Sequence, residues 1–409
     1  MNPRERVLIA LKHEEPDRVP IDLGSMPSTG IMAIAYSRLK KYLGMNKGVI
    51  RVYDTGQQLA EPEKEILEYF NVDVITLTRT LEPCGPSKEK WKPWKLPDGT
   101  QCEVPEWFNP EPDGAGGWVI KNDQGIVVSK MPKDSLFFDG VYHPFEKVEN
   151  LKEVENYEWD SFKINESYAK YLRKKAEYLY ENTNYAIHFF GFGSLHEWGQ
   201  GLRGWSNWLM DLTMKRRIAN VLLEKMFEVL RHNLKIYVEE LKDYVQIIGF
   251  GGEDLGVQSG PQIPPKVYRE MLKPYHSELF HYIKKHSKLF VFLHSCGSIY
   301  SLIPDLIDAG VDIINPVQIS AKNMEPSKLK AEFGKQLTFW GGGVDTQHTF
   351  YKKPEEVYEH VKNNILAFAP GGGYVFTQVH NIVANVPPEN IVAAYRSAYE
   401  NGRYPIVKT

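Results

Sequence analysis

Short apolar runs alternate with longer amphipathic stretches along most of the chain, and this alternation predicts parallel βα units. The short runs are rich in β-branched and aromatic residues and end in Gly, Asp or His. Eight such runs begin near Val19, Val72, Tyr185, Val245, Leu289, Asp312, Gln336 and Gly373. The longer stretches have helical periodicity and cover 27–43, 214–241, 265–285, 300–309, 354–367 and 388–401. Several of them begin with Pro or follow Ser or Asp, as helix starts do.

Eight strands that are each followed by a helix predict an α/β protein with a closed (β/α)₈ TIM barrel. A doubly wound sheet usually has a glycine-rich phosphate turn after its first strand, and no such turn follows "VPIDLG". About 250 residues make a barrel, so the surplus of a 409-residue chain is expected in insertions. We therefore predict one domain over residues 1–409.

The main surplus is residues 81–149, which are rich in Pro, Gly and Trp and lie between the second and third predicted strands. Within them, "GTQCEVPEW" and "GGWVIKNDQGIVVSK" have the turn signals of β-hairpins. We predict a β-rich insertion here, in which Cys84 and Cys102 are structural. Its tryptophans either form a flat apolar lid for an aromatic ligand or a large ring, or pack the insertion itself: Trp91, Trp94, Trp107 and Trp118.

Composition narrows the class of protein further. With 42% apolar and 25% charged residues the chain can bury a large core, and a dispersed net charge of −3 argues against nucleic acid or anionic lipid as a partner. A small, near-neutral partner is expected instead. No apolar run approaches the roughly 20 residues of a membrane span. The first 18 residues have the pattern of an amphipathic helix and not of a signal peptide. Three cysteines are too few for a disulfide framework. These features predict a cytoplasmic protein.

The reactive groups of a (β/α)₈ barrel lie at the C-terminal ends of its strands. His294 and Cys296 stand two residues apart at the end of the fifth run, where both side chains can converge on one point. Imidazole nitrogen and thiolate sulfur are common zinc ligands. We expect the third ligand from His380, after the eighth run, with Glu253 behind it as an oxygen ligand. The alternative is that the cysteine is a small buried apolar residue and the histidine only a hydrogen-bonding group.

Other polar residues are expected on the same rim. "GGGVDTQHTF" either cradles an anion with its backbone N–H groups or forms a tight turn that needs glycine. The candidates for cofactor binding are Gly343, Asp345 and Gln318, and those for catalysis are Asp22, Glu253 and Asp254. Thr78 and Arg79 are expected at the end of the second strand. "SLHEWGQGLRGWSNWLMDL" predicts a helix whose core face holds Trp198, Leu202, Trp205 and Leu209, and whose first turn alternatively lines the mouth.

Several segments together resemble the uroporphyrinogen decarboxylase superfamily, whose fold is a (β/α)₈ barrel. They are "NPRERVLIALKHEEPDRVPIDLG", "YFNVDVITL", "HSCGSIYSLIPDLIDAGVDIINPVQ", "LTFWGGGVDTQ" and "GYVFTQVHNIVANVPPENIVAAYRSA". They occur in the superfamily's order and span nearly the whole chain outside the insertion.

Two chemistries of this superfamily are distinguished by their motifs. True uroporphyrinogen decarboxylases carry an arginine-rich segment soon after the first strand, and no arginine closely follows "VPIDLG" here. The cobalamin-dependent methyltransferases carry His-x-Cys and a distant Cys as zinc ligands. His294 and Cys296 match the first two ligands, and the position of the distant Cys is taken by His380, which is also an acceptable zinc donor.

The resemblance therefore implies a zinc-dependent, corrinoid-linked methyltransferase that acts on a small-molecule substrate. The lower-ligand motif Asp-x-His-x-x-Gly is absent from the sequence, so the cobalamin is expected on a separate corrinoid protein or loosely bound. Glu253 or Asp254 completes the zinc sphere or protonates a leaving group. The alternative is a metal-free carbon–carbon lyase of the decarboxylase type, using Asp22, Asp73 or His380. The polar residues expected on one rim argue against a non-catalytic barrel. A homodimer is expected, because members of the superfamily are commonly dimers.

Overall fold

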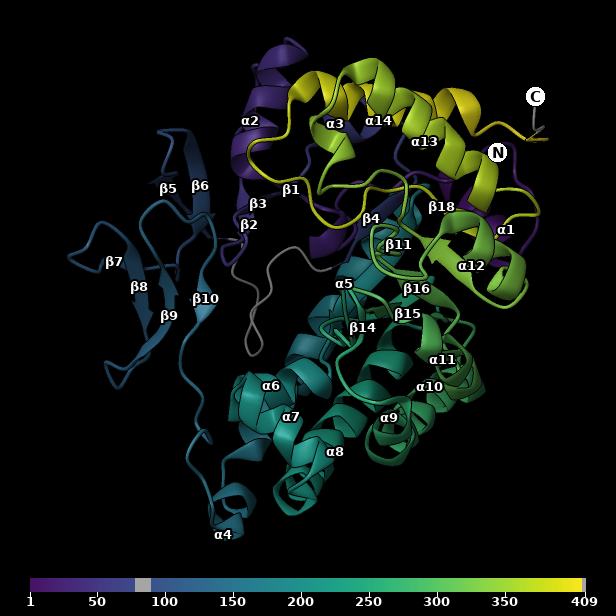
Figure 1. Cartoon of the computed structure of the whole chain (residues 1–409). Helices are drawn as coiled ribbons and strands as arrows, with labels where there is room; N and C mark the ends of the chain where they lie inside the picture. Colours follow the sequence, from purple (N-terminus) through teal and green to yellow (C-terminus); the bar gives the residue numbers. More distant parts are fainter. Residues whose placement is uncertain (78–89, 407–409) are drawn as a thin grey trace.

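The centre of the protein is a curled parallel sheet of seven strands (Figure 1). This computed structural model describes residues 1–77 and 90–406. In sheet order the strands are β4 (Val74–Thr76), β11 (Ala186–Phe192), β12 (Ile247–Phe250), β15 (Phe290–His294), β16 (Ile313–Asn315), β17 (Thr338–Trp340) and β18 (Tyr374–Val375). Each strand pairs in parallel with the next one of this sheet along the chain. This order is the one that successive βα units generate.

The concave side of the sheet is filled by apolar side chains. Each of the seven strands contributes one fully buried residue to a common cluster: Val74, Ala186, Ile247, Phe292, Ile313, Trp340 and Val375. Val7 and Leu11 of α1 (Pro3–Leu11) belong to the same cluster. Since side chains alternate between the two faces of a strand, the β-branched and aromatic runs of the sequence supply both this inner core and the outer one.

Residues 19–22 lie between the two edges of the sheet. Ile21 forms a parallel bridge with Phe376, directly after β18, and the Asp22 N–H donates to the Phe376 carbonyl at 2.9 Å. On the other side, the Asp73 N–H donates to the Ile21 carbonyl at 2.8 Å, directly before β4. The segment therefore has backbone hydrogen bonds to both the first and the last strand of the sheet.

Helices between the strands lie on the outer face of the sheet (Figure 1). They are α5 (Glu166–Asn182), α8 (Arg216–Leu241), α9 (Pro265–Met271), α10 (Lys273–His286), α11 (Ile303–Ala309), α12 (Pro326–Phe333), α13 (Pro354–Phe368) and α14 (Pro388–Asn401). Their buried residues recur every three or four positions, as in α8, where Leu222, Met226, Leu230 and Leu234 are buried. Six of these helices have Pro in the first turn, where its missing N–H costs no hydrogen bond.

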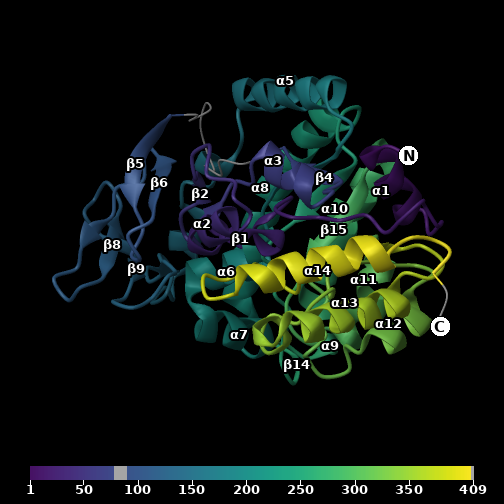
Figure 2. The same cartoon turned by 90° about the horizontal axis from the view of Figure 1, so that it is seen from above.

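Smaller elements stand outside this framework. β1 (Ile31–Met32), β3 (Leu59–Ala60) and β2 (Val52–Asp54) form one antiparallel sheet, next to α2 (Ala33–Tyr42) and α3 (Lys64–Tyr69). Between β4 and β11 the chain forms two more, β5 (Trp91–Lys95) with β6 (Gln101–Pro105), and β7 (Glu111–Pro112), β8 (Trp118–Lys121), β9 (Val127–Met131) and β10 (Asp139–Gly140). Seen from above, they stand to one side of the curled sheet (Figure 2). Short helices follow, α4 (Leu151–Glu155) and the 3₁₀ turn Trp159–Phe162.

Seven of the eight predicted runs are confirmed as strands, and the exception is the first. Its residues make the bridging hydrogen bonds described above but no regular strand of their own. All six predicted helical stretches contain helices, although residues 265–285 are divided into α9 and α10, and residues 27–43 begin as a 3₁₀ turn and a short strand. The sequence analysis did not predict α5, which has only three buried residues: Ala169, Leu172 and Ala176.

One predicted core face is partly wrong. Residues 196–213 form two helices, α6 (His196–Arg203) and α7 (Trp205–Thr213), because Gly204 between them adopts a left-handed φ of +80°. The break changes the helical phase, so Trp205 is 53% exposed and Trp208 is fully buried in its place. Leu202 is buried as predicted.

Three residues of the sequence analysis, Thr78, Arg79 and Cys84, lie outside the described residues, as does the start of the predicted insertion. Cys102 is buried, and its thiol donates to the Trp94 carbonyl, in agreement with a structural role. Within residues 1–77 and 90–406, no helix is both long and apolar enough to cross a bilayer.

Asp73, proposed from the sequence as a catalytic residue of a lyase, lies at the wrong end of the sheet for that role. It directly precedes β4, whereas the site residues follow the strands. Its fully buried carboxylate forms ion pairs with Arg6 at 2.6 Å and Arg18 at 2.7 Å, and accepts a hydrogen bond from the Ile21 N–H at 2.8 Å. Asp73 is therefore a structural residue that holds the segment 18–21 against β4.

We expect Asp73→Asn to lower the free energy of unfolding by about 3–5 kcal/mol, because it leaves the buried guanidinium group of Arg18 without its counter-charge and removes one of the two carboxylates that pair with Arg6. Urea unfolding followed by circular dichroism measures this change. Glu166→Gln is the control, since the exposed pair of Glu166 and Lys170 contributes only about 0.5 kcal/mol. Equal effects of the two substitutions would contradict the structural role of Asp73.

Candidate metal centre

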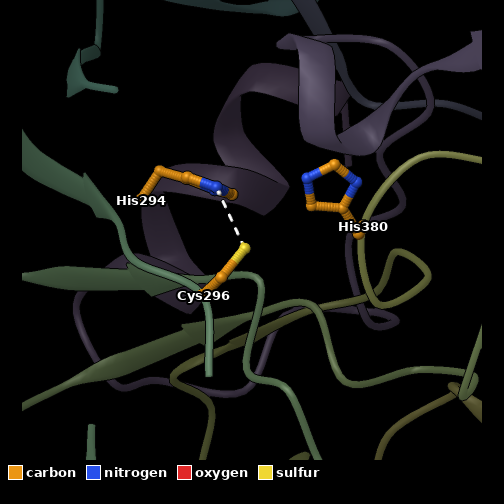
Figure 3. A group of neighbouring side chains, drawn as sticks. All are labelled: His294, Cys296 and His380. Atoms are coloured by element: carbon orange, nitrogen blue, oxygen red, sulfur yellow. Dashed lines mark hydrogen bonds between the residues drawn. The ribbon is translucent and has the colours of Figure 1, made fainter. Parts of the chain in front are cut away.

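His294, Cys296 and His380 meet at the C-terminal end of the sheet (Figure 3). His294 is the last residue of β15, Cys296 follows it after one residue, and His380 comes from the loop after β18. The Nε2 atom of His294 lies 3.5 Å from the Cys296 sulfur. One nitrogen or sulfur atom from each residue lies within 4.8 Å of the other two. The structure thus brings together the three donors that the sequence analysis selected.

The geometry and chemistry of this group fit a zinc ion. In a tetrahedral site with bonds of about 2.0–2.3 Å, ligand atoms are about 3.5 Å apart. The distance between Nε2 of His294 and the Cys296 sulfur already has this value. The ligand atom of His380 lies at most 4.8 Å from the other two, so it needs to move by about 1 Å at most to reach the same spacing. Imidazole and thiolate are both zinc ligands, and three protein ligands with an open fourth position are typical of catalytic zinc sites.

Each histidine of the group is oriented by an asparagine. Nδ1 of His294 lies 2.7 Å from Oδ1 of Asn315, and Nδ1 of His380 lies 3.1 Å from Oδ1 of Asn381. Since a carbonyl oxygen only accepts, both Nδ1 atoms carry the proton and both Nε2 atoms keep a lone pair. Such outer hydrogen bonds are typical of histidines that bind metals. The amides are held in turn, Asn315 by donating to the Trp340 carbonyl and Asn381 by donating to Gln57.

Cys296 lies in a tight loop whose N–H groups are bound by side chains. Its own N–H donates to Oδ1 of Asp254 at 2.7 Å, and the Gly297 N–H donates to Oε1 of Gln318 at 2.8 Å. Gly297 has a φ of +79°, and a Cβ there would meet the backbone of Gly256 at 2.4 Å, so only glycine fits this turn. Burial and the negative charge of Asp254 raise the pKa of the Cys296 thiol well above its usual value. A divalent cation among the three donors would offset both effects.

A cavity of about 600 Å³ opens beside these residues, and we call it the mouth cavity. Its wall contains His294, His380 and Asp254, together with apolar and glycine residues from β11, α6 and the loop after residue 25: Met26, Pro27, Phe190, Phe192, Trp198, Gly191, Gly193 and Gly201. Among the described residues of this wall there is no Lys or Arg. The first turn of α6 lines the mouth, which was the alternative interpretation of that segment.

Glu197 is a site residue that the sequence analysis did not select. It lies in the first turn of α6 and lines the mouth cavity, where its carboxyl group hydrogen-bonds with that of Asp254. Burial and the charges of Asp254 and Glu253 raise the pKa of Glu197 to about 8. Glu197 therefore holds a proton near neutral pH. A signal for it was present in the sequence, because a carboxylate in the helical turn after a strand end faces the same rim.

Glu253 does not join the metal group, which corrects the prediction that it is a ligand. Its buried carboxylate accepts hydrogen bonds from the N–H groups of Leu195 and His196, and its Oε1 lies 3.1 Å from Nε2 of His276. The Glu253 side chain therefore points toward the start of α6 and toward α10. It is absent from the described wall of the mouth cavity, whereas the next residue, Asp254, belongs to it. The two neighbouring acids point to different sides of the loop.

Asp22 is enclosed below the mouth, so the structure does not support its predicted contact with a substrate. Its carboxylate accepts from Ser25 and from Nε1 of Trp340, and the side chain is fully buried. Burial raises the pKa of Asp22 to about 6. The Ser25 hydroxyl also lies 3.3 Å from Nδ1 of His188, whose own pKa burial lowers to about 3.

The segment 341–350 forms a tight turn, and neither Gly343 nor Asp345 lines the mouth cavity among the described residues. A Cβ on Gly343 would lie 2.4 Å from the ring of Phe376, so this glycine permits close packing. The Asp345 carboxylate accepts from the N–H groups of residues 347, 348 and 349 and caps the turn. These contacts correct their predicted role in cofactor binding. Gln318 accepts a hydrogen bond from the Gly297 N–H, so it positions the Cys296 loop and is not itself in the wall of the mouth cavity that the structure describes.

Comparisons with known proteins agree with this arrangement. The family model for uroporphyrinogen decarboxylase matches residues 194–400. Among solved structures, the chain is similar to a methyltransferase from Methanosarcina mazei with a TM-score of 0.59 and 16% sequence identity, over 98% of this chain and 99% of that one. A search of curated proteins gave no match.

Fold and site define an α/β protein with a curled parallel sheet and a cluster of metal-binding residue types at the C-terminal end of its strands. Because the family model covers just over half of the 409 residues, the chain belongs to the uroporphyrinogen decarboxylase family. The match includes β15, the loop after β18 and hence all three residues of the metal group. The resemblance seen in the sequence is confirmed.

We expect Asp22→Asn to change how stability depends on pH. The pKa of Asp22 is about 6 in the folded protein and about 4 in the unfolded chain, so between these values only the folded protein keeps the proton. Asp22 therefore lowers the free energy of unfolding as pH rises, on the order of 1 kcal/mol per pH unit. His188, with a pKa lowered to about 3, contributes in the opposite direction in both proteins.

Urea unfolding of the wild type and Asp22→Asn, at several pH values from about 4.5 to about 6, isolates this contribution. The free energy of the wild type minus that of the variant should fall as pH rises. A difference that stays constant over this range would show that Asp22 is ionised in the folded protein.

Proposed function

We propose that the chain is a zinc-dependent, corrinoid-linked methyltransferase. It moves a methyl group between a small methylated substrate, or a thiol or folate acceptor, and a separate corrinoid protein. The observation that carries the proposal is the convergence of one atom each from His294, Cys296 and His380 within 4.8 Å at the mouth. Zinc held there would lower the pKa of a bound thiol or polarise the oxygen of a methyl ether.

The residues around the mouth supply the other requirements of methyl transfer. Phe190, Trp198 and Met26 give the cavity apolar walls that exclude water from the transferred group. Glu197 holds a proton beside the metal group and can protonate an oxygen leaving group, and Asp254 next to it can accept the proton of a thiol. Methyl transfer is an in-line displacement, so most of the work of the protein is to align donor and acceptor.

The charge of the mouth cavity argues against the lyase alternative. A substrate with several carboxylates requires cationic partners, and the described wall of the cavity contains two carboxyl groups and no Lys or Arg. The same wall suits a neutral methyl ether, a thioether or a thiol. No separate observation favours the lyase.

We also infer that residues 19–22 act as the eighth strand of a closed (β/α)₈ barrel. Their backbone hydrogen bonds to residues on both edges of the sheet support this inference. In that barrel, residues 81–149 are an insertion between the second and third strands. Homodimer formation and a cytoplasmic location stay predictions.

Metal analysis of the purified chain tests the proposal. We expect about one zinc per chain in the wild type and in Cys102→Ser, whose buried thiol lies in the insertion. Cys296→Ser should lose most of the zinc. In an assay with methylcobalamin and a thiol, the zinc-bearing proteins should transfer the methyl group to sulfur and leave cobalt(I), which absorbance detects. A zinc-free chain that releases carbon dioxide from a carboxylated pyrrole would contradict the proposal.

Asn315→Leu should weaken zinc binding by about 10–100-fold, because it removes the oxygen that orients His294. Competition with a chromogenic chelator measures the affinity. Asn315→Asp keeps an acceptor for His294 and for the Ser28 hydroxyl, and should retain most of the affinity. If both variants bind zinc as the wild type does, Asn315 does not position the ligand.

A further inference from the structure

A second cavity, of about 750 Å³, lies between the β2–β3 turn and the small sheets β5 to β9, and we call it the insertion cavity. Among the described residues, none lines both this cavity and the mouth cavity. In Figure 1 these sheets stand beside β2 and β3, away from the helices of the main sheet. The backbone fixes them there, since the Glu103 N–H donates to the Ile50 carbonyl and the Phe138 N–H to the Gly56 carbonyl.

The walls of the insertion cavity are aromatic and apolar. Four rings line it, those of Trp94, Phe108, Trp118 and Phe138, together with Val52, Val104 and Met131. Trp94 packs against Trp118 with centroids 5.4 Å apart and against Phe108 at 5.5 Å, in both cases edge to face. Rings in this arrangement leave faces free for a further flat ring. Of the four tryptophans noted in the sequence, only Trp94 and Trp118 line the cavity.

Gln58 is a buried polar residue of this largely apolar wall, which also contains Thr55 and Gln101. Its side chain is only 5% exposed, and its Oε1 atom has no hydrogen-bond partner among the described residues. Nε2 lies 3.0 Å from the Met131 sulfur, which is a weak acceptor, so exchanging the two ends of the amide would leave a polar atom unsatisfied as well. The backbone of Gln58 has a φ of +53°, a conformation uncommon for a residue with a side chain.

An unsatisfied buried acceptor and a left-handed backbone are both unfavourable, and they occur at the same residue of one cavity wall. Such features concentrate at ligand-binding positions. A hydrogen-bond donor brought by a ligand would satisfy the oxygen. The cavity has the volume of a small-molecule site, for which roughly 300–1,000 Å³ is usual. Lys95 and Asp98 are exposed and also line it, so the entrance lies at the β5–β6 hairpin.

We propose that the insertion cavity binds a small planar aromatic molecule that carries an N–H or O–H group, with this donor directed to Oε1 of Gln58. The rings of Trp94 and Trp118 both contact the molecule, one at its flat face and the other at its edge, since the two rings are edge to face with each other. The site needs no metal and does not depend on the proposed methyl transfer.

Indole and benzofuran are the probes, because they have nearly the same shape and only indole has an N–H donor. Isothermal titration calorimetry of the full-length protein should give binding of both compounds. Indole should bind about tenfold more tightly, the difference expected for one hydrogen bond to a buried acceptor. Gln58→Met keeps the length of the side chain and should remove this preference. Trp94→Leu should weaken the binding of both compounds by a similar factor.

Gln57→Met is the matched control, since Gln57 is the adjacent residue and lines the mouth cavity instead. It should keep the preference for indole. Equal affinities of the two compounds for the wild type, absence of binding, or binding that Trp94→Leu leaves unchanged would each overturn the proposal. Because the comparison of the two compounds uses the wild type, the result stands even if a variant folds poorly.

Discussion

The buried carboxylate of Asp73 is the interaction on which the rest of the structure depends. Its ion pairs with Arg6 and Arg18 and its hydrogen bond to the Ile21 N–H attach residues 18–21 to the start of β4. The chain then rises through the interior to Ser28, whose hydroxyl donates to Asn315 at 2.6 Å. Asn315 in turn orients His294. A buried charge below the sheet thereby sets the position of a candidate metal ligand above it.

The acidic residues of the site have two different roles, one structural and one available for chemistry. Glu253 is enclosed between backbone N–H groups and His276, which fixes the loop after β12 and the start of α6. Asp254 and Glu197 face the mouth cavity, where burial and the neighbouring acidic groups raise the pKa of Glu197 and keep it protonated near neutral pH. The first carboxylate makes the scaffold rigid, and the other two remain available for chemistry. A rigid loop is what allows Cys296 to stand at a fixed distance from His294.

The sequence predicts the strands and the His294–Cys296 pair well, because both depend on local periodicity and on the rule that strand ends share one rim. It predicts the roles of single polar residues less well. Asp73 and Asp22 are both acids beside short apolar runs, but Asp73 lies at the start of its strand and both carboxylates are buried. Their burial depends on contacts with residues far along the chain, Arg6 for Asp73 and Trp340 for Asp22. For Gly343, the sequence cannot distinguish an anion cradle from close packing, since both require the absence of a Cβ. Partners such as Phe376 are known only from the fold.

The β2–β3 turn connects the two cavities through consecutive residues. Gln57 accepts a hydrogen bond from Asn381, which orients His380, and Gln58 lines the insertion cavity. Gln57 is itself held, because its N–H donates to Asp54 at 2.9 Å. The amide of Gln58 and the imidazole of His380 are therefore connected through the peptide bond to Gln57, the Gln57 side chain and two hydrogen bonds. The β2–β3 turn therefore contacts both the wall of the insertion cavity and the residues that orient His380.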